Sequence, residues 1–354
     1  MVIRAFITHK QAELYADCQD RFGVNPDTKS IAVSDGMGST WQQKIWAQLL
    51  VDTYIDSTDW CPSNETIKPL CQTWRSKVAD FIQNLKETNA PENMIYRNER
   101  NFAEGRSAGA TFVGIRFNGD EWGGCVLGDS CLIEWDGNEA KFNTSQDSET
   151  FDSYPDYFDS DASKEGKGIP KPIEGVLTEG KCLLIVSDPF SEFLLEHSKQ
   201  GNIAKYVQQL FSLASHDDFE SLVCEWRKEG MHNDDTTLVI VEYDKSEDIA
   251  ITYLDNIVEM VEKEKLPQIS ANHEIEKTKT PQENPIQEEA KIVENFVVVQ
   301  NNEKDFMNEF LTEYKRCLQK KFPKQMGKLK YKWTQKAVEE ALNLLFERYS
   351  VIKK

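Results

Sequence analysis

Aspartates that could bind a metal ion stand beside apolar segments at several places along this 354-residue chain. Asp35 and Asp188 each come directly after a short apolar run, Asp129 lies in a turn after another run, and Asp234 precedes a fourth. Asp20 stands just before a further stretch with strand character. Aspartate carries its carboxylate oxygens on a short side chain, and strand ends hold such side chains rigidly. The pattern therefore predicts a site for a hard divalent cation.

The competing interpretation is that these residues only shape turns, because Asp and Gly favour tight turns for conformational reasons. For any single turn that explanation is sufficient. Four such turns beside buried β segments are harder to explain in this way, because carboxylates gathered at one end of a sheet repel one another unless a cation neutralises them. No cluster of His or Cys accompanies them, so the ligand chemistry favours Mg²⁺ or Mn²⁺ over zinc or iron.

The elements that must position these carboxylates follow from the hydrophobic pattern. Strands are expected at residues 2–8, 30–33, 111–117, 122–127, 131–135, 182–186 and 237–243, and helices at 40–57, 65–85, 190–197, 203–214 and 218–228. Two long helices stand between groups of strands, and the early strands mostly lack helices between them. This order predicts an α+β fold in layers, with antiparallel pairing.

The composition limits the function classes that need to be considered. The chain has 60 Asp and Glu against 41 Lys and Arg, which gives a net charge of −19 and argues against a general nucleic-acid binder. No apolar run approaches the roughly 20 residues of a membrane span, and the N-terminal residues do not resemble a signal peptide. Eight scattered cysteines without a CxxC pair indicate reduced thiols. We therefore expect a cytoplasmic protein.

Three zones differ in composition along the chain. Residues 1–246 hold nearly all of the Trp and Gly and alternate between strand and helix patterns. Residues 247–302 are rich in Glu, Lys, Gln and Pro, so we expect an acidic and largely disordered linker. Residues 303–354 again show apolar residues at helical spacing, with 13 basic against 7 acidic residues, and predict a small basic helical hairpin.

The basic hairpin admits several interpretations. Its charges could simply form a solvated helix face. They could instead bind an acidic partner, the acidic segment at residues 146–161 of this same chain, or, weakly, a nucleic acid. Fifty residues bury little apolar surface on their own, so we expect the hairpin to pack against something.

The order and spacing of the aspartate blocks resemble those of the metal-dependent protein phosphatases of type 2C. The blocks that carry the resemblance are Gln19-Asp20, Asp35-Gly36-Met37-Gly38, Gly109-Ala110-Thr111, Gly128-Asp129-Ser130, Ser187-Asp188 and Asp234-Asp235-Thr236-Thr237. The resemblance covers about residues 1–245, and the Cys18-Gln19-Asp20 form together with Ser39 after the Gly-rich turn resembles a bacterial branch of the family. It implies a four-layer α/β/β/α sandwich of two antiparallel sheets flanked by helices.

The same resemblance implies a role for each aspartate. Asp35 would bridge two Mn²⁺ or Mg²⁺ ions, the carbonyl of Gly36 would bind one of them, and Asp188 and Asp234 would complete the other. Asp234 is preferred to Asp235 because the first Asp of that block is the ligand in the family. These ligands make Asp35, Asp188 and Asp234 the implied catalytic residues.

Two further aspartates have implied supporting roles. Asp20 would hold metal-bound water, and Asp129 would help to bind a third, weaker ion. A water activated between the two main ions would then hydrolyse phosphoserine or phosphothreonine. The implied partners are a phosphoprotein substrate and an opposing serine/threonine kinase in a signalling pathway.

One departure from the family pattern leaves the phosphate contact open. The family places an Arg about five residues before the early Asp, and this chain has Tyr15 there. Arg4, His9 and Arg21 are the candidate substitutes, and of these His9 is the one we take as phosphate-binding. The missing Arg also supports an alternative function, a catalytically weak, phosphatase-like binding or regulatory module.

Overall fold

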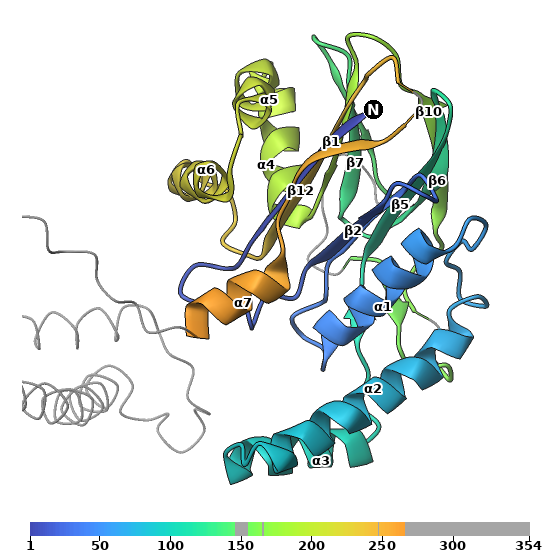
Figure 1. Ribbon diagram of the computed structural model, residues 1–354, viewed down its shortest axis with the longest axis vertical. Helices are drawn as coiled ribbons and strands as arrows, with labels where there is room; N and C mark the ends of the chain where they lie inside the picture. Colours follow the sequence, from blue (N-terminus) through green and yellow to red (C-terminus); the bar gives the residue numbers. More distant parts are fainter. Residues whose placement is uncertain (146–154, 165, 247, 266–354) are drawn as a thin grey trace, which may run out of the picture. The chain divides into compact units, whose positions relative to one another are not determined.

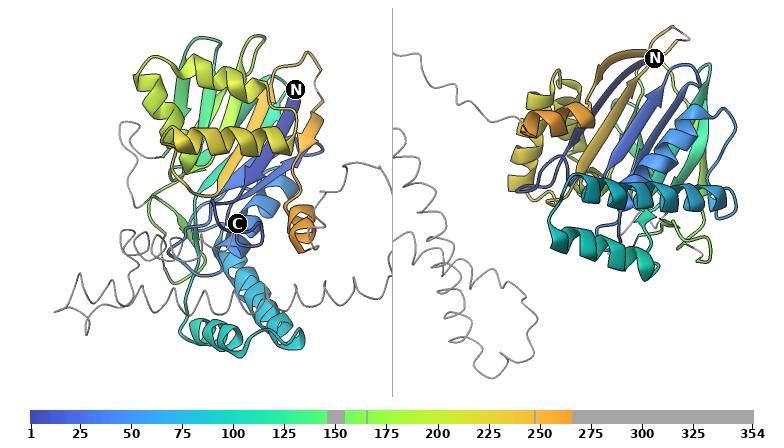
Figure 2. Two further views of the ribbon diagram at one scale, coloured as in Figure 1. Left: turned by 90° about the vertical axis from the view of Figure 1, so that its left-hand side faces the viewer. Right: turned by 60° about the horizontal axis from the view of Figure 1, so that its bottom comes forward.

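Two β-sheets packed face to face, with helices on their outer sides, make up the part of the chain that the structure describes (Figure 1). The structure is a computed structural model, and it describes residues 1–145, 155–164, 166–246 and 248–265. The two further views in Figure 2 show the same layering. The expected four-layer sandwich is confirmed, whereas the hairpin expected at 303–354 lies outside the described residues.

The first sheet has six strands. Their spatial order is β13 (Ala250–Leu254), β1 (Val2–Thr8), β12 (Thr236–Glu242), β11 (Cys182–Val186), β7 (Cys131–Trp135) and β8 (Ala140–Asn143). All neighbours in this sheet pair antiparallel except β1 and β13, which pair parallel. The sequence predicted purely antiparallel sheets, and the parallel pair of β1 and β13 corrects this prediction at one edge.

The second sheet has five strands and is antiparallel throughout. Its spatial order is β10 (Lys171–Val176), β6 (Glu121–Leu127), β5 (Phe112–Asn118), β3 (Ser30–Ser34) and β2 (Arg21–Asn25). A small pair, β4 (Gly109–Ala110) with β9 (Phe158–Asp159), lies beside it. The hairpin expected at residues 111–127 is present as β5 and β6.

Helices cover the outer face of each sheet. On the five-stranded side are α1 (Gln43–Asp56), α2 (Lys68–Glu87) and α3 (Glu92–Ala103); on the six-stranded side are α4 (Asp188–Lys199), α5 (Ile203–Phe211) and α6 (His216–Lys228); and α7 (Ile257–Lys265) follows β13. None of the described helices is long and apolar enough to cross a membrane.

Several strands are nearly continuous runs of apolar residues, because both of their faces are buried. In β11, Leu183 and Ile185 pack between the two sheets, whereas Leu184 packs under the helices of the six-stranded side. In β3, Ile31 lies between the sheets and Ala32 lies under α1. Successive side chains of a strand point to opposite faces, so each strand contributes to two cores. This double burial fixes the strand ends, and with them the turns that carry the aspartates.

Strand β13 and helix α7 correct the domain boundary that the sequence suggested. We expected the linker to begin at residue 247, but residues 250–254 pair with β1 and residues 257–265 are helical. Residues 1–270 form one compact unit. The side chains of this edge strand are mostly exposed, so its hydrophobic pattern is weak, and its composition resembles that of the segment after it. The rest of the expected linker lies outside the described residues.

Candidate metal centre

Five loops that carry aspartates meet at one end of the two sheets. Strand β3 ends one residue before Asp35, and its last residue pairs with Arg21, which directly follows Asp20. In the other sheet, Val186 at the end of β11 pairs with both Leu238 and Cys131. That register brings the turns at residues 128–130, 187–188 and 234–235 to the same end. The fold thus gathers the aspartates that the sequence singled out.

These carboxylates repel one another. Burial raises the pKa of Asp35 well above its ordinary 3.8, and the charges of Asp20, Asp188 and Asp129 raise it further. Burial likewise raises the pKa of Asp188, with added contributions from Asp129, Asp20 and Asp234. Asp20 is completely buried; burial and the charge of a neighbouring aspartate raise its pKa to about 7. Bound positive charge would therefore stabilise the ionised form of these carboxylates.

Two buried oxygens of the cluster have no hydrogen-bond partner. Among the described residues, only five buried side-chain polar atoms lack one, and Oδ1 of Asp20 and Oδ1 of Asp129 are two of these. A buried polar atom without a partner is uncommon in folded proteins and calls for a bound water or ion. Hard, anionic oxygen donors are what Mg²⁺ and Mn²⁺ prefer. The donor set therefore fits a divalent cation.

The described side chains of the cluster do not by themselves form a complete coordination shell. In the part of the chain that the structure describes, no three Asp, Glu, His or Cys side chains converge closely enough to enclose an ion by themselves. A site of this kind needs ligands from water, backbone carbonyls or small side-chain movements to complete its coordination. Only glycine fits at position 36 without a shift of its neighbours, because a Cβ built there would lie 2.9 Å from Cγ of Gln43 and 3.0 Å from the carbonyl oxygen of Gln19.

Hydroxyl groups near the cluster fix its geometry. Thr237 donates to Oδ2 of Asp20 at 2.8 Å, and Asp35 donates its backbone N–H to Oγ1 of Thr111 at 3.3 Å. Ser191 donates to the backbone carbonyls of Asp129 and Asp188 at 2.9 and 3.0 Å, and so ties two of the turns together. Ser191 was not among the residues predicted to belong to the site. Its only signal was its place one helical turn after Ser187.

The two consecutive aspartates before β12 make different contacts. Asp235 is buried, and its two oxygens accept the backbone N–H groups of Lys10 at 2.8 Å and Gln19 at 2.7 Å. Asp234 is 38% exposed, and its Oδ1 lies 3.1 Å from the ammonium nitrogen of Lys10. Both oxygens of Asp235 are engaged by backbone N–H groups, whereas the donors to Asp234, which are the Lys10 ammonium and the Asp235 N–H, both bind Oδ1 and leave its Oδ2 available to an ion. This supports the choice of Asp234 as ligand.

Tyr15, at the position where the Arg was expected, points away from the carboxylates. Its hydroxyl lies 2.6 Å from Nε2 of His216 and donates to Glu220 at 2.7 Å. The ring of His9 packs edge-on against Tyr15, and its Nε2 lies 3.9 Å from Glu264. These contacts give no support to a phosphate-binding role for His9.

The other cations near the cluster differ sharply in what they bind. Arg21 donates to the carbonyls of Cys18 and Asp20, and Arg4 donates to the carbonyls of Phe211 and Leu213 and to the carboxylate of Glu242, which lies outside the cluster. The ammonium group of Lys10 instead lies on a carboxylate of the cluster and remains 37% exposed. No sequence pattern pointed to Lys10, because only the fold of residues 9–20 brings it to Asp234.

The chain is similar to a known protein family over most of its described residues. The family model described as protein phosphatase 2C matches residues 10–235, which is more than half of the chain. The matched segment includes all of the aspartates of the cluster. A search of the curated proteins found no match.

Several solved structures are similar to the chain. The serine/threonine phosphatase of S. agalactiae has 16% identity and a TM-score of 0.43, with 68% of this chain and 99% of that chain covered. PppA of Pseudomonas aeruginosa, described as a key regulatory component of T6SS, has 16% identity, 68% and 98% coverage and a TM-score of 0.43. The catalytic domain of PstP, solved with two manganese ions, has 16% identity, 68% and 96% coverage and a TM-score of 0.39.

Proposed function

Because the chain belongs to the protein phosphatase 2C family, we propose that it hydrolyses phosphoserine and phosphothreonine in proteins, with two Mn²⁺ or Mg²⁺ ions held by its carboxylate cluster. The observation that carries the proposal is the set of aspartates at one end of both sheets, two of which have buried oxygens without a partner. Asp35, Asp188 and Asp234, with the carbonyl of Gly36, would be the ligands.

Each aspartate of the cluster would have its own role around the ions. When bound, the ions supply a water of lowered pKa for attack on phosphorus and offset the charge of the phosphoryl oxygens. The charges of Asp20, Asp188 and Asp129 all act on Asp35, so Asp35 would hold the centre of the metal site. Asp20, fixed by Thr237, would orient water, and Asp129 would serve a third, weaker ion. A serine/threonine kinase would supply the substrate, since the reaction removes what such an enzyme adds.

The direct test is metal-dependent hydrolysis by the full-length protein. After treatment with EDTA, phosphate release from a phosphothreonine peptide should fall to background, and Mn²⁺ or Mg²⁺ should restore it. A phosphotyrosine peptide of the same sequence measures selectivity. Hydrolysis that is indifferent to EDTA would refute the metal assignment. Metal binding by calorimetry without any hydrolysis would instead favour the phosphatase-like binding module.

Lys10 is the cation best placed to meet a substrate phosphoryl group. Replacing Lys10 with Met should raise KM for the phosphothreonine peptide by roughly ten- to a hundredfold, because hydrogen bonds to charged groups contribute about 1.5–3 kcal/mol. Mn²⁺ affinity should be kept or increased, since Asp234 loses a competing ammonium group. Lys141→Met, which removes an exposed pair with Glu134, is the control. An unchanged KM in Lys10→Met would exclude this contact.

A further inference from the structure

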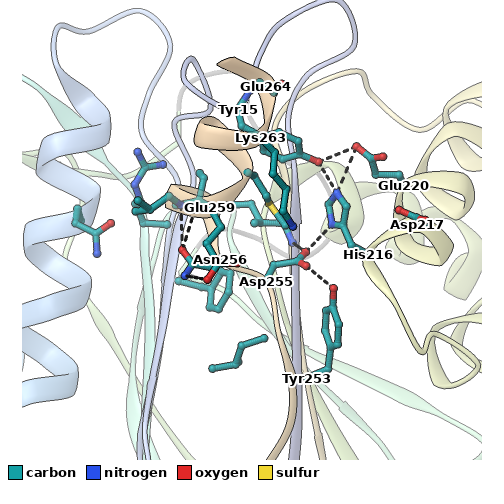
Figure 3. Close-up of a pocket in the computed structure, with 18 residues that line it drawn as sticks. Tyr15, His216, Asp217, Glu220, Tyr253, Asp255, Asn256, Glu259, Lys263 and Glu264 are labelled. Atoms are coloured by element: carbon teal, nitrogen blue, oxygen red, sulfur yellow. Dashed lines mark hydrogen bonds and ion pairs between the residues drawn. The ribbon is translucent and has the colours of Figure 1, made fainter. Parts of the chain in front are cut away.

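A pocket of about 980 Å³ is lined by α7 and by Tyr15 of the segment that precedes Asp20 (Figure 3). Its walls come from the ends of β1 and β13, the first turn of α6, strand β2, helix α1 and helix α7. The match to the phosphatase family ends at residue 235, so β13 and α7 lie beyond it. The pocket is therefore built partly from structure that the family assignment does not explain.

The loop at residues 9–20, called here the 9–20 loop, separates this pocket from the carboxylate cluster. Asp235 anchors both ends of the loop on the side of the cluster, because one of its oxygens accepts from the N–H of Lys10 and the other accepts from the N–H of Gln19. This anchor places the Lys10 ammonium on Asp234. It also fixes the chain directly before Asp20.

The middle of the 9–20 loop is anchored on the pocket side, through Tyr15. Glu264 of α7 accepts the backbone N–H of Tyr15 at 2.9 Å. The Tyr15 hydroxyl binds His216 and Glu220 (Figure 3). Burial alone would lower the pKa of His216, but the hydrogen bonds that its ring donates to the carboxylates of Asp255 and Glu220 raise this pKa to about 9. The protonated imidazole can therefore donate from both nitrogens, while Tyr15 accepts from it and donates to Glu220.

The position of α7 is itself fixed by the end of β1. Asp255, whose side chain is fully buried, accepts the backbone N–H of Ile7 at 2.9 Å and contacts Nδ1 of His216 at 2.9 Å. Tyr253 donates to its other oxygen at 2.8 Å. The turn between β13 and α7 is thus held rigidly, and Glu264 extends from this fixed helix to the loop.

We propose that Glu264 is a positioning residue, which holds the 9–20 loop through Tyr15 so that Lys10 and Asp20 are presented to the carboxylate cluster. A carboxylate that accepts a backbone N–H makes one of the stronger hydrogen bonds in proteins. Within the loop, the described backbone bonds are three short-range turns. Without Glu264, the loop keeps its ends on Asp235 and the bond from the Lys44 ammonium to the carbonyl of Ala16 at 2.7 Å, and it loses the acceptor of the Tyr15 N–H. The kinetic part of this inference rests on the proposed phosphatase function, whereas the structural part does not.

The test compares three variants of the full-length protein. In Glu264→Ala, amide hydrogen exchange of residues 9–20 should become about tenfold faster, which corresponds to the loss of one charge-assisted hydrogen bond. Glu264→Gln keeps an acceptor oxygen and should restore most of the protection. Glu262→Ala is the matched control, because Glu262 has the same charge, lies on the same helix and is exposed. It should exchange like the wild type.

A kinetic measurement separates positioning from a merely structural role. Glu264→Ala should raise KM for a phosphothreonine peptide about three- to tenfold with kcat changed less than twofold, because the loop carries Lys10. Unchanged exchange of residues 9–20 would overturn the proposal. So would faster exchange in all strands together with a lower Tm, since that result indicates general destabilisation. If the wild type hydrolyses no phosphopeptide, the proposed function fails, and the exchange data still decide the role of Glu264.

Discussion

Replacing Asp35 with Asn should lower metal-dependent phosphate release by more than about a hundredfold. Mutation of a residue that only supports a metal ligand lowers metal affinity or activity by about ten- to a hundredfold. Asp35 is proposed as a ligand itself, so its loss should cost more. Three other aspartates of the cluster contribute to its raised pKa, so it stands at the centre of the site. Asn keeps the size of the side chain and removes the charge. Mn²⁺ binding measured by calorimetry should weaken in parallel with turnover.

The matched control for this experiment lies at the opposite end of the same sheet. Asp120 stands in the Asn118-Gly119-Asp120 turn between β5 and β6, so it is an exposed aspartate of a tight turn beside a strand. Asp120→Asn should leave turnover and Mn²⁺ binding unchanged. If both variants behaved alike, or if Asp35→Asn kept wild-type turnover in Mn²⁺, the aspartates would be turn formers and the metal assignment would be wrong.

The sequence predicted the positions of the carboxylates because each one is encoded locally. A buried strand is a short apolar run, its end is a turn, and the turn residue is read directly beside it. Strands at residues 131–135 and 182–186 were therefore predicted with their observed bounds. The convergence of the turns required the register of the sheets, which the resemblance to a known family supplied in advance.

The contacts that support the site could not be predicted in this way, because they join residues far apart in the chain. Asp235 is 225 residues from Lys10, and Glu264 is 249 residues from Tyr15. A local pattern shows that Tyr15 replaces an expected Arg, but it does not show where the ring points. The same limit applies to α3, whose residues are mostly polar and whose one fully buried residue is Asn98.

A cluster built for cations should weaken the metal-free protein, and Asp188 offers a way to measure this. In EDTA at pH 7, Asp188→Asn should raise the free energy of unfolding by about 1–3 kcal/mol, because it removes one of several like charges from a site where burial and neighbouring carboxylates raise the pKa of Asp188. One effect opposes this gain. Asp188 is the first residue of α4, where a negative charge stabilises a helix by about 0.3–1 kcal/mol.

The pH dependence gives the sign of the effect. A carboxyl group whose pKa is raised on folding destabilises the folded state above its ordinary value of 3.8, and this cost disappears when both states are protonated. The advantage of Asp188→Asn in EDTA should therefore shrink as the pH falls towards 4.

Metal should reverse the order of stability. Mn²⁺ stabilises the folded state by RT ln(1 + [Mn²⁺]/Kd), so it should raise the free energy of unfolding of the wild type strongly and that of Asp188→Asn only slightly. Urea denaturation with EDTA and with Mn²⁺ measures both effects on the same samples. A variant less stable than the wild type in EDTA would show that the Asp188 carboxylate is already satisfied without metal. If the variant is the more stable protein in EDTA and the wild type is the more stable protein in Mn²⁺, the carboxylates serve metal binding and lower the stability of the protein without metal.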